Sequence, residues 1–218
     1  MAKYPIFLEL GGRRAVIIGG GSVAVRKAQS LLAAGTRLVV VAERISDMMT
    51  ALCTDSTAEL ITAPYSKDYL VGAVLAIAAT NSRPLNERIY KDCQQLEILC
   101  NVVDVPELCD FFVPAVVKRG SLQVAIGTEG ASPAYAAHIR KKLEAILTEK
   151  HGQFLAELEQ LRKTALDKLP DPAARKVLSG RLAGDESFDY FVEKGPDEWR
   201  RRAAESLERY ADADRPAP

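Results

Sequence analysis

The feature that most constrains the fold of this chain is a glycine-rich turn placed between an apolar strand and a helix. Residues 15–18 are Ala-Val-Ile-Ile, and residues 19–24 are Gly-Gly-Gly-Ser-Val-Ala. In the pattern G-x-G-x-x-A, Gly19 permits a tight turn, Gly21 leaves the backbone open to a close ligand, and Ala24 lets the helix pack closely on the strand. Free amides at the start of that helix carry partial positive charge and attract phosphate. The alternative is a glycine turn in an α/β domain without ligand.

Short apolar runs without strict alternation indicate strands that are covered on both faces, as in a parallel sheet. Such runs lie at residues 15–18, 38–41, 75–79 and 98–103, and helical segments lie between them at residues 23–34, 45–52 and 84–93. Gly35 suits the left-handed position after the first helix. Alternating strands and helices predict an α/β fold, a Rossmann-type doubly wound parallel sheet with right-handed crossovers.

Two further polar positions are expected at the carboxyl edge of this sheet, where ligands bind in open α/β folds. Glu43 follows the second predicted strand, 22 residues after Gly21, where a carboxylate takes the ribose hydroxyls of an adenosine. It favours NAD over NADP, although the adjacent Arg44 could instead meet a 2′-phosphate. Thr80 follows the strand at residues 75–79 and is either a cofactor contact or part of a capped turn. The predicted cofactor-binding residues are therefore Gly19, Gly21, Ser22, Val23, Ala24, Glu43, Arg44 and Thr80.

After residue 104 the alternation stops. Residues 111–117 and 121–126 predict a β-hairpin joined by residues 118–120, and no covering helix is evident. An isolated hairpin with an apolar face needs a partner, so we expect a homodimer built on it. The alternative is that the helix predicted at residues 133–147, which starts at Ser132-Pro133, covers the hairpin within one chain.

The rest of the chain reads as helices, at residues 153–168, 172–182 and 197–210. The sequence thus predicts three parts: a dinucleotide-binding domain over residues 1–112, a dimerisation region over 113–150, and a small all-helical domain over 151–218.

Composition excludes several classes of function. Lys and Arg number 29 and Asp and Glu number 29, so net charge gives no reason to expect nucleic acid or an anionic membrane as partner. No apolar run approaches the length of a membrane span and no signal peptide is evident, which predicts a cytoplasmic protein. Four cysteines without metal-ligand spacing and two histidines predict reduced thiols and no protein-built metal site.

Several motifs together carry a family resemblance. They are Pro5-Ile6-Phe7, the segment 19–28 (GGGSVAVRKA), the segment 76–80 (AIAAT), Asn101-Val102-Val103-Asp104, and Gly130-Ala131-Ser132-Pro133. With them in this order, the chain resembles the precorrin-2 dehydrogenase family over residues 4–150, as a stand-alone relative of the amino-terminal module of siroheme synthase. Relatives commonly have an acidic residue where Ser22 stands, and often serine where Thr128 stands.

The resemblance implies NAD-dependent oxidation of precorrin-2 to sirohydrochlorin, a step towards siroheme. It leaves open whether the chain also takes Fe²⁺ as a substrate and inserts it. The resemblance places catalysis on Asp104, and its position after an apolar strand supports this, because a carboxylate beside the nicotinamide can accept the proton that leaves with hydride removal. The alternative is a turn-capping aspartate before a proline.

Precorrin-2 carries eight carboxylates, which a chain without net charge must meet with a local group of cations. The predicted substrate-binding residues are Lys118, Arg119, Thr128, Arg140 and Lys141, and each of the cations could instead be a solvated surface charge. Two rival functions stay open: a non-catalytic NAD-sensing regulatory module, and a chelatase that has lost dehydrogenation. The glycine turn argues against the second.

Overall fold

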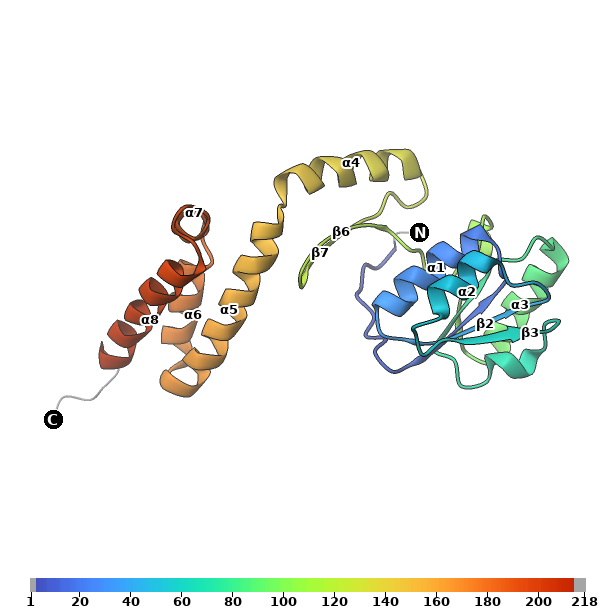
Figure 1. Cartoon of the computed structure of the whole chain (residues 1–218), viewed down its shortest axis with the longest axis horizontal. Coiled ribbons are helices and arrows are strands. Elements are labelled where there is room, and N and C mark those ends of the chain that lie inside the picture. The colour runs from blue at the N-terminus through green and yellow to red at the C-terminus, as the bar shows by residue number, and fades with distance from the viewer. Residues whose placement is uncertain (1–2, 214–218) are drawn as a thin grey trace. The chain divides into compact units, whose positions relative to one another are not determined.

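The computed structural model describes residues 3–213, and its contacts divide the chain into two compact units after Val113. The first unit is an α/β domain, and the second combines a β-hairpin with helices (Figure 1). Within residues 3–213, no helix is long and apolar enough to cross a membrane. The predicted division at residues 112 and 150 stays a prediction.

A five-stranded parallel sheet forms the centre of the first unit, with the strand order β3-β2-β1-β4-β5. The strands are β1 (Arg14–Ile18), β2 (Arg37–Ala42), β3 (Glu59–Thr62), β4 (Leu75–Ala78) and β5 (Leu99–Val102). The predicted doubly wound α/β fold is confirmed. The sequence missed β3, because this edge strand is short and half-exposed and has a polar residue at each end, and so lacks the apolar run that marks the other four.

Two apolar layers flank this sheet. Side chains of β1 alternate between them: Ala15 and Ile17 face α1 (Ser22–Ala33) and α2 (Asp47–Cys53), while Val16 and Ile18 face α3 (Arg83–Gln95). All four are almost completely buried. A 3₁₀ turn, η1 (Lys67–Leu70), lies on the α3 side. Burial on both faces is why these strands read as continuous apolar runs.

The hairpin of the second unit consists of the antiparallel strands β6 (Ala115–Arg119) and β7 (Leu122–Ile126). Its turn is Gly120-Ser121, and Gly120 takes a φ of +57° that glycine adopts without strain. The predicted turn at residues 118–120 is therefore wrong, because Lys118 and Arg119 belong to β6 and the chain before residue 115 is not a strand.

The helix α4 (Pro133–Ile146) covers one face of this hairpin, as Figure 1 shows. Ser132 caps it by accepting a hydrogen bond from the Tyr135 amide at 3.1 Å, as the sequence predicted. In β6, Val117 is buried, whereas the neighbouring Val116, on the opposite face of the strand, is exposed. The expectation that the hairpin lacks a covering helix is wrong, and coverage within one chain is confirmed.

Four helices complete the second unit: α5 (Glu149–Lys168), α6 (Pro172–Leu182), α7 (Asp185–Lys194) and α8 (Pro196–Ala213). Their core holds Phe154, Phe191 and Trp199, whose rings meet edge to face or tilted. The Trp199 Nε1 donates to the Ser187 hydroxyl at 2.8 Å, which satisfies its buried polar atom. The sequence missed α7, a short helix between Gly184 and Gly195.

Two glycines join the hairpin turn to the start of α5. A Cβ on Gly152 would lie 2.7 Å from the carbonyl carbon of Arg119 and 2.9 Å from the Gly120 amide nitrogen. These are backbone atoms that cannot move aside. The contact therefore requires glycine, although glycine is a poor residue inside a helix.

We expect Gly152→Ala to lower the free energy of unfolding by about 1–3 kcal/mol, because the new methyl group overpacks a rigid contact. Gly180→Ala in α6 is the matched control, since its Cβ would meet nothing within 4 Å. That control should raise the stability by about 0.5–1 kcal/mol through helix propensity. Urea unfolding followed by Trp199 fluorescence measures both, and equal effects of the two changes would contradict the requirement for glycine at position 152.

Candidate functional site

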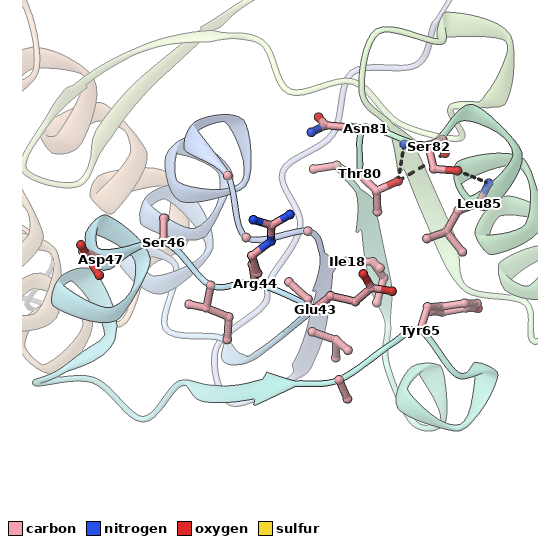
Figure 2. A pocket seen from close by; sticks show the side chains of 18 residues that line it. Ile18, Glu43, Arg44, Ser46, Asp47, Tyr65, Thr80, Asn81, Ser82 and Leu85 are labelled. Carbon is pink, nitrogen blue, oxygen red and sulfur yellow. Dashed lines mark hydrogen bonds between the residues drawn. The ribbon is translucent and has the colours of Figure 1, made fainter.

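A cleft with a volume of about 1020 Å³ opens at the carboxyl edge of the parallel sheet (Figure 2). Loops after β1, β2, β3 and β4 line it, together with the first turns of α2 and α3. It brings together five of the predicted cofactor residues, which are Gly19, Gly21, Glu43, Arg44 and Thr80. This is the edge at which the strand order reverses and at which open α/β sheets bind ligands.

The glycine turn allows three strand ends to meet at this cleft. A Cβ on Gly19, whose φ is +130°, would lie 2.3 Å from the Ala79 carbonyl oxygen after β4. A Cβ on Gly20 would lie 2.3 Å from the Arg44 carbonyl oxygen after β2. Gly21 differs, because a Cβ there would meet nothing within 4 Å. The sequence thus missed the requirement at Gly20, and Gly21 is left open to a ligand.

The helix α1 begins at the lining of this cleft. Gly21 is the N-cap residue, and no side chain among the described residues caps the helix. Ser22 is exposed and Val23 half-buried, whereas Ala24 is fully buried in the core between α1 and the sheet. Uncapped amides and the helix dipole suit an anionic group. Ala24 fits the predicted packing role, and its contact with a cofactor stays a prediction.

Glu43 and Arg44 follow β2 directly, and both side chains are exposed in the cleft. In Figure 2 the Glu43 carboxylate extends towards Tyr65, whereas the Arg44 guanidinium extends the other way, towards the glycine turn. The next element, α2, is capped by Ser46, which accepts from the Met49 amide at 3.3 Å. The carboxylate and the guanidinium are thus two separate polar contacts for a ligand.

Thr80 is held by a buried asparagine that the sequence analysis missed. Its hydroxyl donates to the Asn86 Oδ1 at 2.7 Å, and the Asn86 Nδ2 donates back to the Thr80 carbonyl oxygen at 3.1 Å. Ser82 caps α3 by accepting from the Leu85 amide at 3.4 Å. The capped turn is therefore present, and Thr80, Ser82 and Leu85 from it line the cleft. An asparagine one turn after a Ser-Arg-Pro helix start was the available signal.

Asp104 lies in a turn just after β5, with an exposed side chain and a φ of +61°. The left-handed region is uncommon for residues other than glycine, and aspartate tolerates it better than most. The Val105 amide donates to the Val102 carbonyl oxygen at 3.3 Å, which closes the turn around Asp104. The Cys109 thiol donates to the Val102 carbonyl oxygen at 3.2 Å and the Val105 carbonyl oxygen at 3.3 Å.

Buried Asn101 ties this turn to the chain that follows it. Its Nδ2 donates to the Phe111 carbonyl oxygen at 2.9 Å, and Asn101 forms an isolated antiparallel bridge with Cys109. Asp110 accepts from the Cys100 amide at 2.8 Å. Residues 109–111 therefore run along the edge of β5 as a strap that fixes the backbone on either side of Asp104.

A lysine on α1 is electrostatically coupled to this region. Burial lowers the pKa of Lys27, the charge of Arg26 adds to that effect, and the charges of Cys109 and Asp104 oppose it. The sequence analysis did not assign Lys27 a role, although it lies in the glycine segment 19–28 that carries the family resemblance.

The predicted substrate residues all lie in the second unit. Lys118 and Lys141 are exposed, and Arg140 pairs with Glu144. The Arg119 guanidinium donates to the Leu147 carbonyl oxygen at 2.7 Å and the Glu144 carbonyl oxygen at 3.2 Å, so it caps the end of α4. Thr128 accepts from the Ser132 amide at 3.3 Å. Their contact with a substrate stays a prediction, and the position of Arg119 supports a structural role.

The described residues contain no group of three or more His, Cys, Asp or Glu side chains that could hold a metal ion. Cys53, Cys93, Cys100 and Cys109 are free thiols.

The sheet and its cleft define a dinucleotide-binding protein of the Rossmann type. A family model described as "Putative NAD(P)-binding" matches residues 6–115, which is half of the chain, and a second, described as "Sirohaem biosynthesis protein central", matches residues 119–146. The chain therefore belongs to the family described as "Putative NAD(P)-binding". The resemblance found in the sequence is confirmed.

The chain is similar to several curated siroheme synthases. That of Pseudomonas aeruginosa (strain LESB58) is 37% identical over 207 residues, which cover 95% of this chain and 44% of the relative. That of Psychrobacter sp. (strain PRwf-1) is 36% identical over 176 residues, which cover 81% of this chain and 36% of the relative. The chain thus spans less than half the length of these relatives.

A solved structure titled "SirC, precorrin-2 dehydrogenase" has the same fold. It superimposes with a TM-score of 0.78 at 23% identity, and the match covers 95% of this chain and 100% of the other.

The open side of Gly21 gives a direct test of cofactor binding. We expect Gly21→Ala to weaken NAD⁺ binding at least about 10-fold with little loss of stability, because its φ of −85° suits alanine and the methyl group enters the ligand space. Gly19→Ala should instead destabilise the first unit, through its clash with Ala79 and its positive φ. Calorimetric binding and thermal unfolding separate the two, and unchanged NAD⁺ affinity in Gly21→Ala would contradict the placement.

Proposed function

We propose that this protein oxidises precorrin-2 to sirohydrochlorin with NAD⁺ as the hydride acceptor. The observation that carries the proposal is the cleft at the carboxyl edge, where a glycine turn with an open Gly21 meets the uncapped start of α1 and the carboxylate of Glu43. The family membership and the relatives named siroheme synthase and precorrin-2 dehydrogenase support the choice of substrate.

The residues present fit a nicotinamide dinucleotide. The amides of residues 22–24 and the open backbone at Gly21 would hold the pyrophosphate, and Glu43 would accept hydrogen bonds from the adenosine ribose. When bound, NAD⁺ supplies a hydride acceptor. Arg44 is the only cation among the described residues that line the cleft, beside the carboxylates of Glu43 and Asp47, so a 2′-phosphate would meet net repulsion. This supports NAD over NADP.

Asp104 is the proposed catalytic residue. Oxidation of precorrin-2 removes two hydrogen atoms, one as a hydride and one as a proton. Loss of the hydride leaves the macrocycle positively charged, and an ionised carboxylate can then take the proton from it. The exposed side chain of Asp104, on a turn fixed by the strap 109–111, meets the requirement for a base that is both accessible and held in place.

In the second unit, Lys118, Arg140 and Lys141 are the proposed partners for the carboxylates of the macrocycle, with Thr128 as a hydrogen-bonding contact. Lys118 and Lys141 are the more available cations, since Arg140 pairs with Glu144 and Arg119 caps α4. Tetrapyrrole affinity that falls as salt rises would support these contacts.

We also propose a homodimer. The hairpin has only two strands, so each strand has one unpaired edge, and Val116 on its outer face is 40% exposed. Unpaired edges with exposed apolar side chains favour pairing with another chain. Light scattering at micromolar concentration should give twice the monomer mass, and a monomer would contradict this proposal.

The decisive experiment supplies precorrin-2 and NAD⁺ without oxygen and follows the formation of NADH. Turnover distinguishes the enzyme from an NAD-sensing module, which would bind NAD⁺ without producing NADH. Addition of Fe²⁺ or Co²⁺ to sirohydrochlorin then tests whether a metal ion is a further substrate.

Asp104→Asn keeps the size of the side chain and removes its basicity. We expect it to lower kcat by about 10²- to 10⁴-fold, the range for general acid–base catalysis, with the Kd for NAD⁺ unchanged. Glu107→Gln, three residues along the same exposed loop, is the control and should retain wild-type turnover. Full turnover by Asp104→Asn would remove Asp104 from the mechanism.

A further inference from the structure

Tyr65 lies in the wall of the cleft, three residues after the end of β3. It is half-buried and packs against the apolar layer between the sheet and α3. Ala63 from the same loop and Leu85 from α3 also line the cleft. This part of the cleft is therefore apolar and includes an aromatic ring.

The ring of Tyr65 is fixed from behind. Its hydroxyl donates to the Asp92 Oδ2 at 2.9 Å, and the Arg88 guanidinium lies over the ring, 5.6 Å from its centroid. The same Asp92 oxygen lies 3.8 Å from the Arg88 Nε, and Lys67 Nζ lies 4.0 Å from the other oxygen. Burial raises the pKa of Tyr65 well above its usual value, and the hydrogen bond and charge of Asp92 add to this, so the hydroxyl stays a donor.

The order of groups along the cleft matches the order of groups in an adenine dinucleotide. Figure 2 shows the Arg44 side of the cleft next to the glycine turn, then the Glu43 carboxylate, and then Tyr65. In the ligand, the pyrophosphate is followed by the adenosine ribose and then by the adenine ring. With the pyrophosphate at the glycine turn and the ribose at Glu43, the adenine reaches the part of the cleft that Tyr65 lines.

We propose that Tyr65 is the platform on which the adenine ring of the cofactor stacks, with Asp92 and Arg88 as the residues that position it. This inference rests on the cofactor placement in the proposed function and adds a binding residue to it. A planar purine against a fixed aromatic ring gains dispersion and offset stacking, and a ring that is already ordered loses little entropy on binding.

A second hollow of about 480 Å³ offers the rival position. It shares Glu43, Arg44 and Ile45 with the main cleft and is otherwise lined by Thr50, Leu60 and Thr62, none of which is aromatic. Adenine in this hollow would bind without stacking. The two positions can therefore be separated by changes at Tyr65 and at Thr62, which is exposed at the end of β3.

The test measures the Kd of AMP and of nicotinamide mononucleotide by calorimetry, using the whole chain without tetrapyrrole. Tyr65→Leu keeps apolar packing and removes the ring, so AMP should bind roughly 5- to 150-fold more weakly, the range that one stacked base supplies. Nicotinamide mononucleotide should bind as in wild type, which also shows that the fold is intact. Tyr65→Phe keeps the ring and should hold AMP affinity within about threefold, the size of one modest hydrogen-bond effect on positioning.

Tyr69→Leu is the matched control, because Tyr69 packs in the same apolar layer and does not line the cleft. It should leave AMP affinity unchanged. The fluorescence of etheno-AMP gives an independent signal: quenching on binding to the wild type supports stacking, and the quenching should be lost in Tyr65→Leu.

Two results would overturn the inference. The first is an AMP affinity in Tyr65→Leu equal to that of the wild type. The second is loss of AMP binding in Thr62→Trp while Tyr65→Leu still binds AMP, and this result would place adenine in the second hollow. Failure of the wild type to bind NAD⁺ would instead overturn the proposed function itself, so the two failures are distinguishable.

Discussion

The structure depends on the close approach of backbone to backbone at the glycine turn. Side chains at Gly19 and Gly20 would collide with the carbonyl oxygens of Ala79 and Arg44, both at 2.3 Å, so the ends of β1, β2 and β4 can meet only because these positions are bare. This approach also leaves the start of α1 uncapped at the edge of the sheet. The cleft thus forms because the strand ends lie closer together than side chains at Gly19 and Gly20 would allow. Every cofactor contact that we propose depends on this cleft.

A second constraint acts at the loop after β5. A left-handed non-glycine residue costs on the order of 1–3 kcal/mol and persists only where its surroundings impose it. Here the hydrogen bonds of Asn101 and Cys109 surround the turn of residues 102–105 and hold Asp104 at a φ of +61°. The strain is local to the residue that the family resemblance associates with catalysis. An exposed carboxylate on a rigid backbone has its position set by the fold and not by its own side-chain packing.

The sequence predicted those elements whose signal is local. A pattern of only a few residues indicates each of three features: the glycine turn, the four apolar strands and the Ser132-Pro133 helix start. The structure confirms all three. What it missed depends on residues distant in the chain. From the sequence alone, Arg119 is a candidate free cation. In the structure it donates to two carbonyl groups at the end of α4, which lie 25 and 28 residues later in the chain. The sequence did not show that α4 covers the hairpin, because this contact depends on how α4 folds back onto β6 and β7. The sequence also missed β3, because this edge strand has no apolar run.

The charges of the cleft bear on the proposed function, in which a protein without net charge takes two different anions, a phosphorylated cofactor and a polycarboxylate macrocycle. Of the described residues lining the cleft, Glu43 and Asp47 are anionic and only Arg44 is cationic, so side-chain charge does not draw anions there. Pyrophosphate binding must then come from backbone amides and the dipole of α1, which act only at short range and only on a correctly placed group. A ligand with eight carboxylates would instead depend on side-chain cations, and among the described residues Lys118 and Lys141 of the second unit are exposed and form no ion pair within 4.0 Å. In the proposed function, selectivity between the two anions would therefore arise from the different physical sources of positive potential.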